Sequence, residues 1–358
     1  MNNRLARLKE VVSARLDQIS DPITGQGLWS AGRVVGLEAG ADGKVSFTIE
    51  APADAVDRYV PVRDAAEAAA RAAPGAKSVT AVLTAHEAKT QTAGGIAGVK
   101  HVIAVASAKG GVGKSTVAVN LACAFAALGF KTGLLDLDVY GPSAPTLLGL
   151  QGKRPAPGPQ KTLLPIETHG LKTMSIGYLV DPNSAMIWRG AMATSAVRQM
   201  IDDIVWGELD VLLLDLPPGT GDVQLTLVQR VPLAGAVIVS TPQEMALADV
   251  RRGLAMFEKT RAPVLGIIEN MAYFETPGGQ RSYIFGQGGA RRTAEQAGAP
   301  FLGEIPIDVS LRESADAGAP LVAAQPAHAI AQRFRDIAEA ALANVARLNK
   351  PAPRIVVN

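Results

Sequence analysis

The chain has 358 residues, of which 48% are hydrophobic and 19% charged, values that exclude disordered and fibrous proteins. At about 100–200 residues per domain, this length favours two domains. Lys and Arg number 35 and Asp and Glu 33, and the resulting net charge of +2 is too balanced for a general nucleic-acid-binding surface. The single cysteine excludes a disulfide scaffold and any metal site made of several cysteines from one chain.

The cellular location is indicated by what the sequence lacks. The opening segment, residues 1–16, is charged and amphipathic and has neither the apolar run nor the cleavage site of a secretory signal. No window approaches the roughly 18 uncharged apolar residues that a membrane-spanning helix needs. A single cysteine also suits a reducing compartment. We therefore expect a cytoplasmic protein with no membrane partner.

Residues 1–85 predict a small α+β domain. A first helix is indicated by apolar residues at helical spacing, namely Leu5, Leu8, Val12, Leu16 and Ile19. It should end before Pro22, because the residue preceding a proline is pushed out of the α-helical region. The following elements are two strands joined by an Asp-Gly turn, an alanine-rich helix and a third strand, over residues 33–37, 44–50, 62–73 and 78–84. The predicted order is α-β-β-α-β.

The pattern changes after a linker, which we place at residues 86–99 because they are small, polar and without periodicity. Apolar runs without alternation follow, at residues 101–107, 132–138, 210–216, 234–240 and 263–270. Helical segments separate several of these runs. Such runs are typical of parallel strands buried on both faces. Residues 100–350 therefore predict a three-layer α/β domain with a parallel sheet, followed by a tail at 351–358. We expect a helix over residues 327–348 to dock on this sheet.

The most specific motif is the glycine-rich segment of residues 108–116, AKGGVGKST, which lies between a predicted strand and a predicted helix. Its glycines allow successive backbone N–H groups to surround phosphate oxygens, assisted by the helix N-terminus. Lys114 should neutralise the outer phosphates, and Ser115 should offer its hydroxyl to Mg²⁺. The usual first glycine is replaced by Ala108, and a second lysine follows it. The predicted ATP-binding residues of this loop are Lys109, Gly110, Gly111, Val112, Gly113, Lys114, Ser115 and Thr116.

Acidic residues follow two of the predicted strands. Asp136 and Asp138 come at the end of one strand, and Asp215 at the end of another. In open α/β sheets the ligand crevice lies at these carboxyl ends. We expect Asp215 to hold Mg²⁺ through a water, Asp138 to orient the attacking water, and Asp136 to support them. The predicted catalytic residues are Lys109, Lys114, Asp138 and Asp215. A single such aspartate could equally cap a turn, but the order after the phosphate loop favours an ATPase site.

Eight segments occur in the order expected of one family: KGGVGKST, DLDVYGPSAPTLLG, WRGAM, DLPPGTGDVQLTL, TPQEMAL, ENMAYF, IFGQGGARR and GEIPIDVSLRES. The chain resembles the Mrp/ApbC family of ATP-binding iron–sulfur cluster carriers. These are deviant P-loop NTPases, related to nitrogenase iron protein and to cell-division and partition ATPases. The resemblance covers roughly residues 95–345, and the N-terminal domain resembles one fused to bacterial members and found in other cluster-assembly proteins.

The resemblance implies further roles. Lys109 would reach the nucleotide phosphates across a homodimer interface. Asn270, which follows the predicted strand 264–268, would contact the adenine edge, and Pro306 would lie beside the base. The segments after Asp138 and Asp215 would sense the γ-phosphate. The implied partners are iron–sulfur scaffold proteins or client apoproteins.

The chain departs from the family at the cluster ligands. Cluster-carrying members have a C-x-x-C pair between the asparagine–methionine and F-G-x-G-G motifs, whereas Thr276 and Gly279 occupy those places here. The cysteine of the family's N-terminal domain is also missing from residues 50–57. Two family pairs would give the four thiolates of a [4Fe–4S] cluster. The only thiol, Cys123, is expected to be a buried apolar residue. We predict no iron–sulfur ligands, and a bound cluster is in doubt.

Two other functions remain to be weighed against an assembly ATPase. A nucleotide-switched positioning protein of the partition type would bind DNA or a membrane surface, which the near-zero net charge disfavours. A catalytically idle scaffold is disfavoured by Lys114, Asp138 and Asp215. Trp188 and Arg189 are equally consistent with a partner contact and with ordinary packing.

Overall fold

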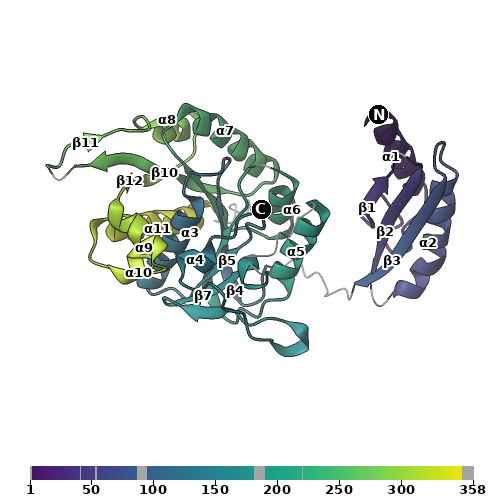
Figure 1. Cartoon of the computed structure of the whole chain (residues 1–358), viewed down its shortest axis with the longest axis horizontal. Coiled ribbons are helices and arrows are strands. Elements are labelled where there is room, and N and C mark those ends of the chain that lie inside the picture. The colour runs from purple at the N-terminus through teal and green to yellow at the C-terminus, as the bar shows by residue number, and fades with distance from the viewer. Residues whose placement is uncertain are drawn as a thin grey trace, which may run out of the picture. The chain divides into compact units, whose positions relative to one another are not determined.

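A computed structural model describes residues 2–40, 42–52, 55–86, 95–180, 190–219, 221–276 and 278–348. The chain divides into two compact units, Met1–Ala93 and Gly94–Asn358, which are treated separately (Figure 1). Trp188, Arg189 and the tail 351–358 lie outside the described residues, as does most of the predicted linker.

The smaller unit is a three-stranded sheet with two helices. Its elements are α1 (Asn2–Leu16), β1 (Val34–Ala39), β2 (Lys44–Pro52), α2 (Val56–Arg71) and β3 (Ser78–His86). The strand order is β1-β2-β3, with β1 antiparallel and β3 parallel to β2. Alternate strand residues such as Phe47 and Ile49 are buried against Leu16 and Tyr59. Helix α2 begins before the predicted start at residue 62 and includes Pro61.

The larger unit begins with a strand and the helix that follows the glycine-rich loop. Its first half contains β4 (Val99–Ala106), α3 (Lys114–Ala127), β5 (Thr132–Asp136), α4 (Ala144–Leu147), two 3₁₀ turns (Pro159–Lys161 and Ile176–Tyr178), β6 (Ile166–Thr168), β7 (Leu171–Ser175), α5 (Gly190–Asp202), β8 (Leu209–Asp215) and α6 (Asp222–Arg230). Its second half contains β9 (Gly235–Ser240), α7 (Glu244–Lys259), β10 (Val264–Glu275), β11 (Arg281–Ser282), α8 (Gly289–Gln296), β12 (Phe301–Ile307), α9 (Val309–Asp316), α10 (Leu321–Ala324) and α11 (Ala329–Leu348).

The larger unit is built on a nine-stranded, mostly parallel sheet. The strand order is β11-β10-β9-β4-β8-β5-β7-β6, and β12 pairs with β10. Among the described strands of this sheet, only β6 and β11 run antiparallel to their neighbours, and neither short strand was predicted. The order places β4 between β8 and β9, so the loop after β4 lies beside the carboxyl ends of β8 and β5. The predicted α/β fold with a parallel-dominated sheet is confirmed.

Helices cover both faces of this sheet, because successive strand residues point to opposite faces. On one face Ile103 and Val105 pack with α3, α10 and α11. On the other face Val102 and Ala104 pack with α5, α6, α7 and α8. Figure 1 shows the two groups of helices on either side of the strands, with the β10–β11 hairpin projecting from the body of this unit. This arrangement explains why the strands have no polar alternation.

The C-terminal helix α11 belongs to the core of the larger unit. It buries one apolar stripe that includes Ile330, Phe334, Ile337, Ala341 and Val345 against α3 and β12. Docking on the sheet was expected, and the structure confirms it. Among the described residues, no helix is long and apolar enough to cross a membrane.

Candidate nucleotide-binding site

The glycine-rich loop joins the end of β4 to the start of α3. Gly111 and Gly113 have φ values of 82° and 78°, in the left-handed region that glycine adopts without a Cβ penalty. The hydroxyl of Ser107 donates to the carbonyl of Lys109 at 3.0 Å, and the Gly219 N–H donates to the carbonyl of Ser107 at 2.9 Å. The loop is therefore held at its base by the segment that follows Asp215.

Lys114 is the centre of the charged groups around this loop. Its side chain is 6% exposed, and its ammonium forms an ion pair with the Asp215 carboxylate. The same Nζ lies 4.0 Å from Asp138 Oδ2 and 3.3 Å from the Ser115 hydroxyl. The carboxyl ends of β8 and β5 thus bring together the two aspartates predicted to be catalytic, the loop lysine and the predicted Mg²⁺ hydroxyl.

Asp136 supports this cluster from the interior of the unit. It is fully buried and accepts hydrogen bonds from the Asp138 N–H at 3.0 Å, the Ala144 N–H at 3.1 Å and the Ser175 hydroxyl at 3.0 Å. Burial, reinforced by the charge of Asp215, raises the pKa of Asp136 to about 7. Asp136 therefore fixes the backbone on both sides of the loop that carries Asp138.

Asp138 is placed at the surface of the same cluster. It accepts a hydrogen bond from the Tyr140 N–H at 3.3 Å, and its side chain is 12% exposed. Burial raises its pKa, an effect that the nearby Lys114 ammonium opposes. A partly accessible carboxylate with a raised pKa, beside a phosphate loop, has the position and basicity that water activation requires.

The residues that the family resemblance assigns to the base lie on β10 and β12. The Asn270 side-chain amide donates to the Val112 carbonyl at 2.8 Å, so it contacts the phosphate loop directly. Asn270 pairs with Ile305 across the parallel strands, which places Pro306 one residue further along the same edge. The structure thus brings Asn270 to the loop, and Pro306 follows the residue that pairs with Asn270 on β12. Lys109 is half-buried, and its ammonium forms no ion pair within the described part of the chain.

The oxygen donors around Lys114 fit Mg²⁺ bound together with a nucleotide. Carboxylate and hydroxyl oxygens are ligands that Mg²⁺ accepts, and in nucleotide sites the protein supplies only one or two of them. Asp215 and Ser115 both lie against the Lys114 ammonium. The described residues contain no group of three His, Cys, Asp or Glu side chains placed to hold a metal by themselves. The donor set therefore suits a metal shared with phosphate oxygens.

The residues at the family's cluster positions do not fit an iron–sulfur cluster. Thr276 and Gly279 lie at the tip of the β10–β11 hairpin, where the Gly279 N–H donates to the Thr276 carbonyl at 2.8 Å. Neither residue has a thiol. Cys123 is 3% exposed within α3, and burial raises its pKa to about 12. This thiol is therefore inert and cannot reach the hairpin, because it is packed in the core on the α3 face.

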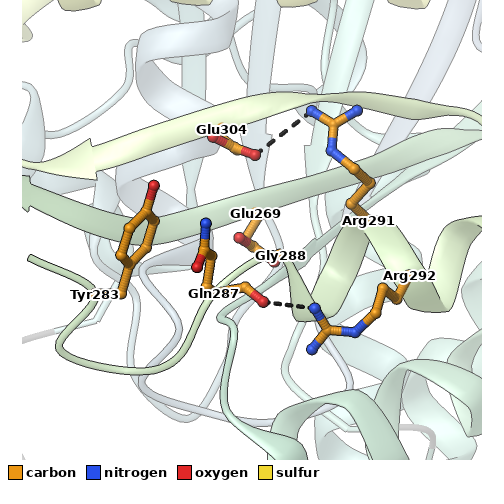
Figure 2. Close-up of a pocket in the computed structure, with 7 residues that line it drawn as sticks. All are labelled: Glu269, Tyr283, Gln287, Gly288, Arg291, Arg292 and Glu304. Carbon is orange, nitrogen blue, oxygen red and sulfur yellow. Dashed lines mark hydrogen bonds and ion pairs between the residues drawn. The ribbon is translucent and has the colours of Figure 1, made fainter. Parts of the chain in front are cut away.

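A second feature lies where β10 and β12 meet α8 (Figure 2). A cavity of about 290 Å³ is lined by Glu269, Tyr283, Gln287, Gly288, Arg291, Arg292 and Glu304. Two of its charged groups bond to the backbone: the Glu269 carboxylate accepts from the Ala290 N–H at 2.6 Å, and Arg292 donates to the Gln287 carbonyl at 2.7 Å. Arg291 lies 3.5 Å from Glu304. We interpret this cavity as part of the packing of α8 against β10 and β12.

Three residues of the site were not predicted from the sequence. Ser175 donates to Asp136, which holds the Asp138 loop. Glu269 accepts a hydrogen bond at the start of α8. Asn120 bonds the Thr116 carbonyl at 2.9 Å and accepts from the Val322 N–H at 3.1 Å, so it joins the loop helix to α10. A buried asparagine one helical turn after the loop was a signal available in the sequence. The roles of Ser175 and Glu269 depend on strand pairing.

The parallel sheet and the loop between β4 and α3 define the chain as a P-loop NTPase. Residues 98–342 match the family model described as the NUBPL iron-transfer P-loop NTPase, and residues 9–83 match that of an iron–sulfur cluster assembly protein. The chain belongs to this family of iron-transfer P-loop NTPases, which confirms the resemblance to cluster carriers.

The relatives agree with this assignment. The chain is 51% identical over 246 residues to an iron–sulfur cluster carrier protein of Salmonella typhimurium, covering 68% of this chain and 67% of that protein. It is 44% identical over 338 residues to a protein of the same description from Deinococcus radiodurans, covering 92% of this chain and 94% of that protein. The second alignment spans both units.

Solved structures support the fold. A nucleotide-binding protein of Archaeoglobus fulgidus in complex with ADP has a TM-score of 0.55 and 46% identity, covering 62% of this chain and 87% of that one. The cell-division ATPase MinD of Pyrococcus furiosus has a TM-score of 0.51 at 21% identity, covering 69% of this chain and 99% of that one. The second similarity shows the fold alone.

Proposed function

We propose that this protein is an Mg-ATP-dependent homodimeric ATPase that acts in iron–sulfur cluster assembly or in delivery of clusters to apoproteins. The observation that carries the proposal is the position of Lys114. Its ammonium meets Asp215, lies 4.0 Å from Asp138, and stands beside the Ser115 hydroxyl at the opening of a phosphate loop. These are the groups that phosphoryl transfer to water requires.

Each group has a distinct task in this proposal. The loop N–H groups and Lys114 bind the phosphates, while Ser115 and Asp215 hold Mg²⁺, which neutralises charge on the phosphate oxygens. Asp138 orients the attacking water and accepts its proton, and Asp136 keeps the Asp138 loop in place through its three hydrogen bonds. Pro306 and Asn270 flank the base. Hydrolysis is expected to be slow.

The dimer is proposed because of Lys109. Its half-buried ammonium has no carboxylate partner among the described residues. In this proposal Lys114 already binds the phosphates of its own subunit, so Lys109 is not needed for them. A second loop lysine can add to catalysis by reaching the nucleotide of a partner subunit. Lys109→Ala should therefore reduce hydrolysis more than nucleotide affinity. Light scattering with a non-hydrolysable ATP analogue should show a dimer in the unmodified protein. A monomer with normal hydrolysis would contradict this.

The iron–sulfur role rests on the family and on the relatives described as cluster carriers. We infer that the cluster is cargo held jointly with a partner, because the hairpin has no thiol at either family position. The N-terminal unit, residues 1–85 in the predicted division, is proposed to contact the scaffold or the client apoprotein. The predicted cytoplasmic location and the predicted absence of nucleic-acid and membrane partners stay predictions.

Transfer of a preassembled cluster tests the proposed function. A [4Fe–4S]-loaded scaffold protein and an apoenzyme that needs this cluster are mixed anaerobically with the protein, with and without Mg-ATP. Recovery of enzyme activity should be faster with protein and ATP than with scaffold alone. Lys114→Ala should remove the acceleration. Normal ATP hydrolysis without any acceleration would retain the ATPase and refute the cluster role. Vesicle pelleting and a DNA mobility shift, each with and without ATP, test the partition-type alternative.

A further inference from the structure

We propose that Asn270 is a positioning residue for the phosphate loop, and that it acts on phosphate binding independently of the base. Its side chain fixes the peptide between Val112 and Gly113, so that the Gly113 N–H faces the phosphates. The inference rests on the proposed nucleotide site and deepens it. The family resemblance gives Asn270 only a contact with the adenine edge, which is a different role.

The first support is the hydrogen bond itself. Asn270 Nδ2 donates to the Val112 carbonyl at 2.8 Å across 158 positions of sequence, and the contact is buried. Asn270 is 5% exposed and Val112 is 4% exposed. A buried backbone carbonyl requires a partner. Asn270 provides it at a point where the loop's own backbone is in an irregular conformation.

The direction of this bond determines the direction of a phosphate-binding group. The peptide unit is planar and trans, so the carbonyl of Val112 and the N–H of Gly113 point in opposite directions. When Asn270 holds the carbonyl on its own side, the Gly113 N–H must point away from β10 toward the inside of the loop. This peptide joins Val112 to Gly113, and Gly113, with a φ of 78°, restricts rotation of the peptide only weakly because it has no side chain. An external hydrogen bond is therefore needed to keep one orientation.

The second support is the space around Gly113. A Cβ built on Gly113 would lie 2.3 Å from Asn270 Nδ2, so any side chain at this position would displace the Asn270 amide from its contact with the loop. The absence of a side chain at this position thus permits the amide of Asn270 to reach the loop. Gly113 serves two purposes here, a left-handed backbone and the close approach of β10.

The third support is the backbone that presents Asn270. The residue is held in register on β10 by pairing with Ile305 of β12. The next residue, Met271, has a φ of 55°, a conformation that residues other than glycine rarely adopt. The register of β10 with β12 shifts between Asn270 and Phe274. Regular strand pairing is therefore interrupted after this amide, and the unfavourable backbone of Met271 lies next to the contact with the loop.

A ligand without a base separates the two roles of Asn270. The probe is tripolyphosphate with Mg²⁺, titrated calorimetrically against the full chain, with Mg-ADP titrated in parallel. Asn270→Ala should weaken tripolyphosphate binding by about 5- to 10-fold, the loss expected for one buried hydrogen bond. Pro306→Ala, which the proposal places only beside the base, should weaken ADP binding and leave tripolyphosphate binding unchanged.

A matched control is available on α11 (Ala329–Leu348), which packs against the same strand. The Asn344 side chain donates to the Leu265 carbonyl at 2.8 Å, the same type of bond near the start of β10. Asn344→Ala should leave the affinities for both ligands unchanged, which shows that loss of an asparagine contact with β10 is not sufficient. Asn270→Leu keeps a similar size without a charge but loses the donor, and it should reproduce the loss seen in Asn270→Ala. Asn270→Asp adds a negative charge beside the phosphates and should weaken binding further.

The outcomes are distinguishable. Unchanged tripolyphosphate affinity in folded Asn270→Ala and Asn270→Leu, together with weakened ADP binding, would overturn the inference and leave a base contact alone. If the unmodified protein binds neither ligand, the proposed nucleotide site is wrong and the inference fails with it. Far-ultraviolet circular dichroism and the melting temperature establish folding of each variant. Should Asn270→Ala not fold, the uncharged Asn270→Leu decides the question: unchanged tripolyphosphate affinity in this variant would overturn the inference.

Discussion

The ammonium of Lys114 and the carboxylate of Asp215 form a buried ion pair between the start of α3 and the end of β8, 101 residues apart in sequence. The pair joins the group that would bind phosphate to the group that would hold Mg²⁺. Asp138, 4.0 Å from the same ammonium, completes the charge cluster. Altering any of these charges should therefore affect the other two.

Replacing Lys114 should have two separate effects. Lys114→Ala is expected to abolish tight ADP binding, because the phosphates lose their charged partner. It should also lower the free energy of unfolding by about 3–5 kcal/mol, since the buried Asp215 carboxylate loses its partner. Calorimetric titration and chemical denaturation measure the two effects. Lys114→Arg retains the charge and should recover part of the stability without recovering affinity. Unchanged affinity in Lys114→Ala would refute the site.

Asp138→Asn should separate binding from turnover. Because Asp138 is placed to orient water rather than to hold phosphate, ADP affinity should stay close to that of the unmodified protein. The rate of ATP hydrolysis should fall by about 10²–10⁴-fold, the usual contribution of a positioned general base. Steady-state phosphate release checks this. A rate within experimental error of the unmodified protein would show that another group activates the water.

The raised pKa of Asp136 predicts how the stability of the protein depends on pH. Its pKa is about 7 in the fold and 3.8 in its ordinary environment, so between these values the folded protein keeps a proton that the unfolded chain has released. Stability from this group is therefore full below about pH 4 and declines as the pH rises toward 7. The melting temperature of the unmodified protein should fall more steeply between pH 5 and 7.5 than that of Asp136→Asn. Parallel curves would contradict the shifted pKa.

The Asp136→Asn variant should also be less stable at pH 5. Asp136 accepts hydrogen bonds from two backbone N–H groups and the Ser175 hydroxyl. At pH 5 the folded Asp136 carries a proton, but both of its oxygens can still accept. The amide nitrogen of an asparagine cannot accept, so at least one of these donors loses its partner. The expected cost is about 1–3 kcal/mol. A variant as stable as the unmodified protein at this pH would show that the donors find other acceptors.

The hairpin at Thr276 and Gly279 predicts that the isolated protein retains no stable cluster. After anaerobic reconstitution and desalting without added thiol, its iron content should be near zero, and Cys123→Ser should not change it. The double variant Thr276→Cys, Gly279→Cys restores the family spacing and should retain about four irons per dimer, the content of one [4Fe–4S] cluster. Gly279 has open space around its Cβ position but a φ of 76°, so some stability will be lost. Iron that depends on Cys123 would contradict the prediction.

Much of the site could be predicted from the sequence because its signals are local. The loop of residues 108–116 can be recognised from the sequence alone, because the glycines and lysines proposed to bind phosphate are contiguous. Asp138 and Asp215 could be placed by a general rule, because the carboxyl ends of parallel strands meet at one edge of a sheet. The structure brings both within reach of Lys114. The class of fold followed from apolar strands without alternation, which only a doubly covered sheet explains.

Only the tertiary structure decided how the loop is held. The contact of Asn270 with Val112 depends on which residue of β10 faces α3, and a shift of one residue would exchange it with Glu269, which caps α8 on the other face. The left-handed backbone of Met271 has no local sequence signal, because the surrounding strands, and not the residue itself, hold this unfavourable conformation. The sequence by itself thus determined the phosphate loop and the groups proposed for the chemistry, and strand register determined which groups hold the loop in place.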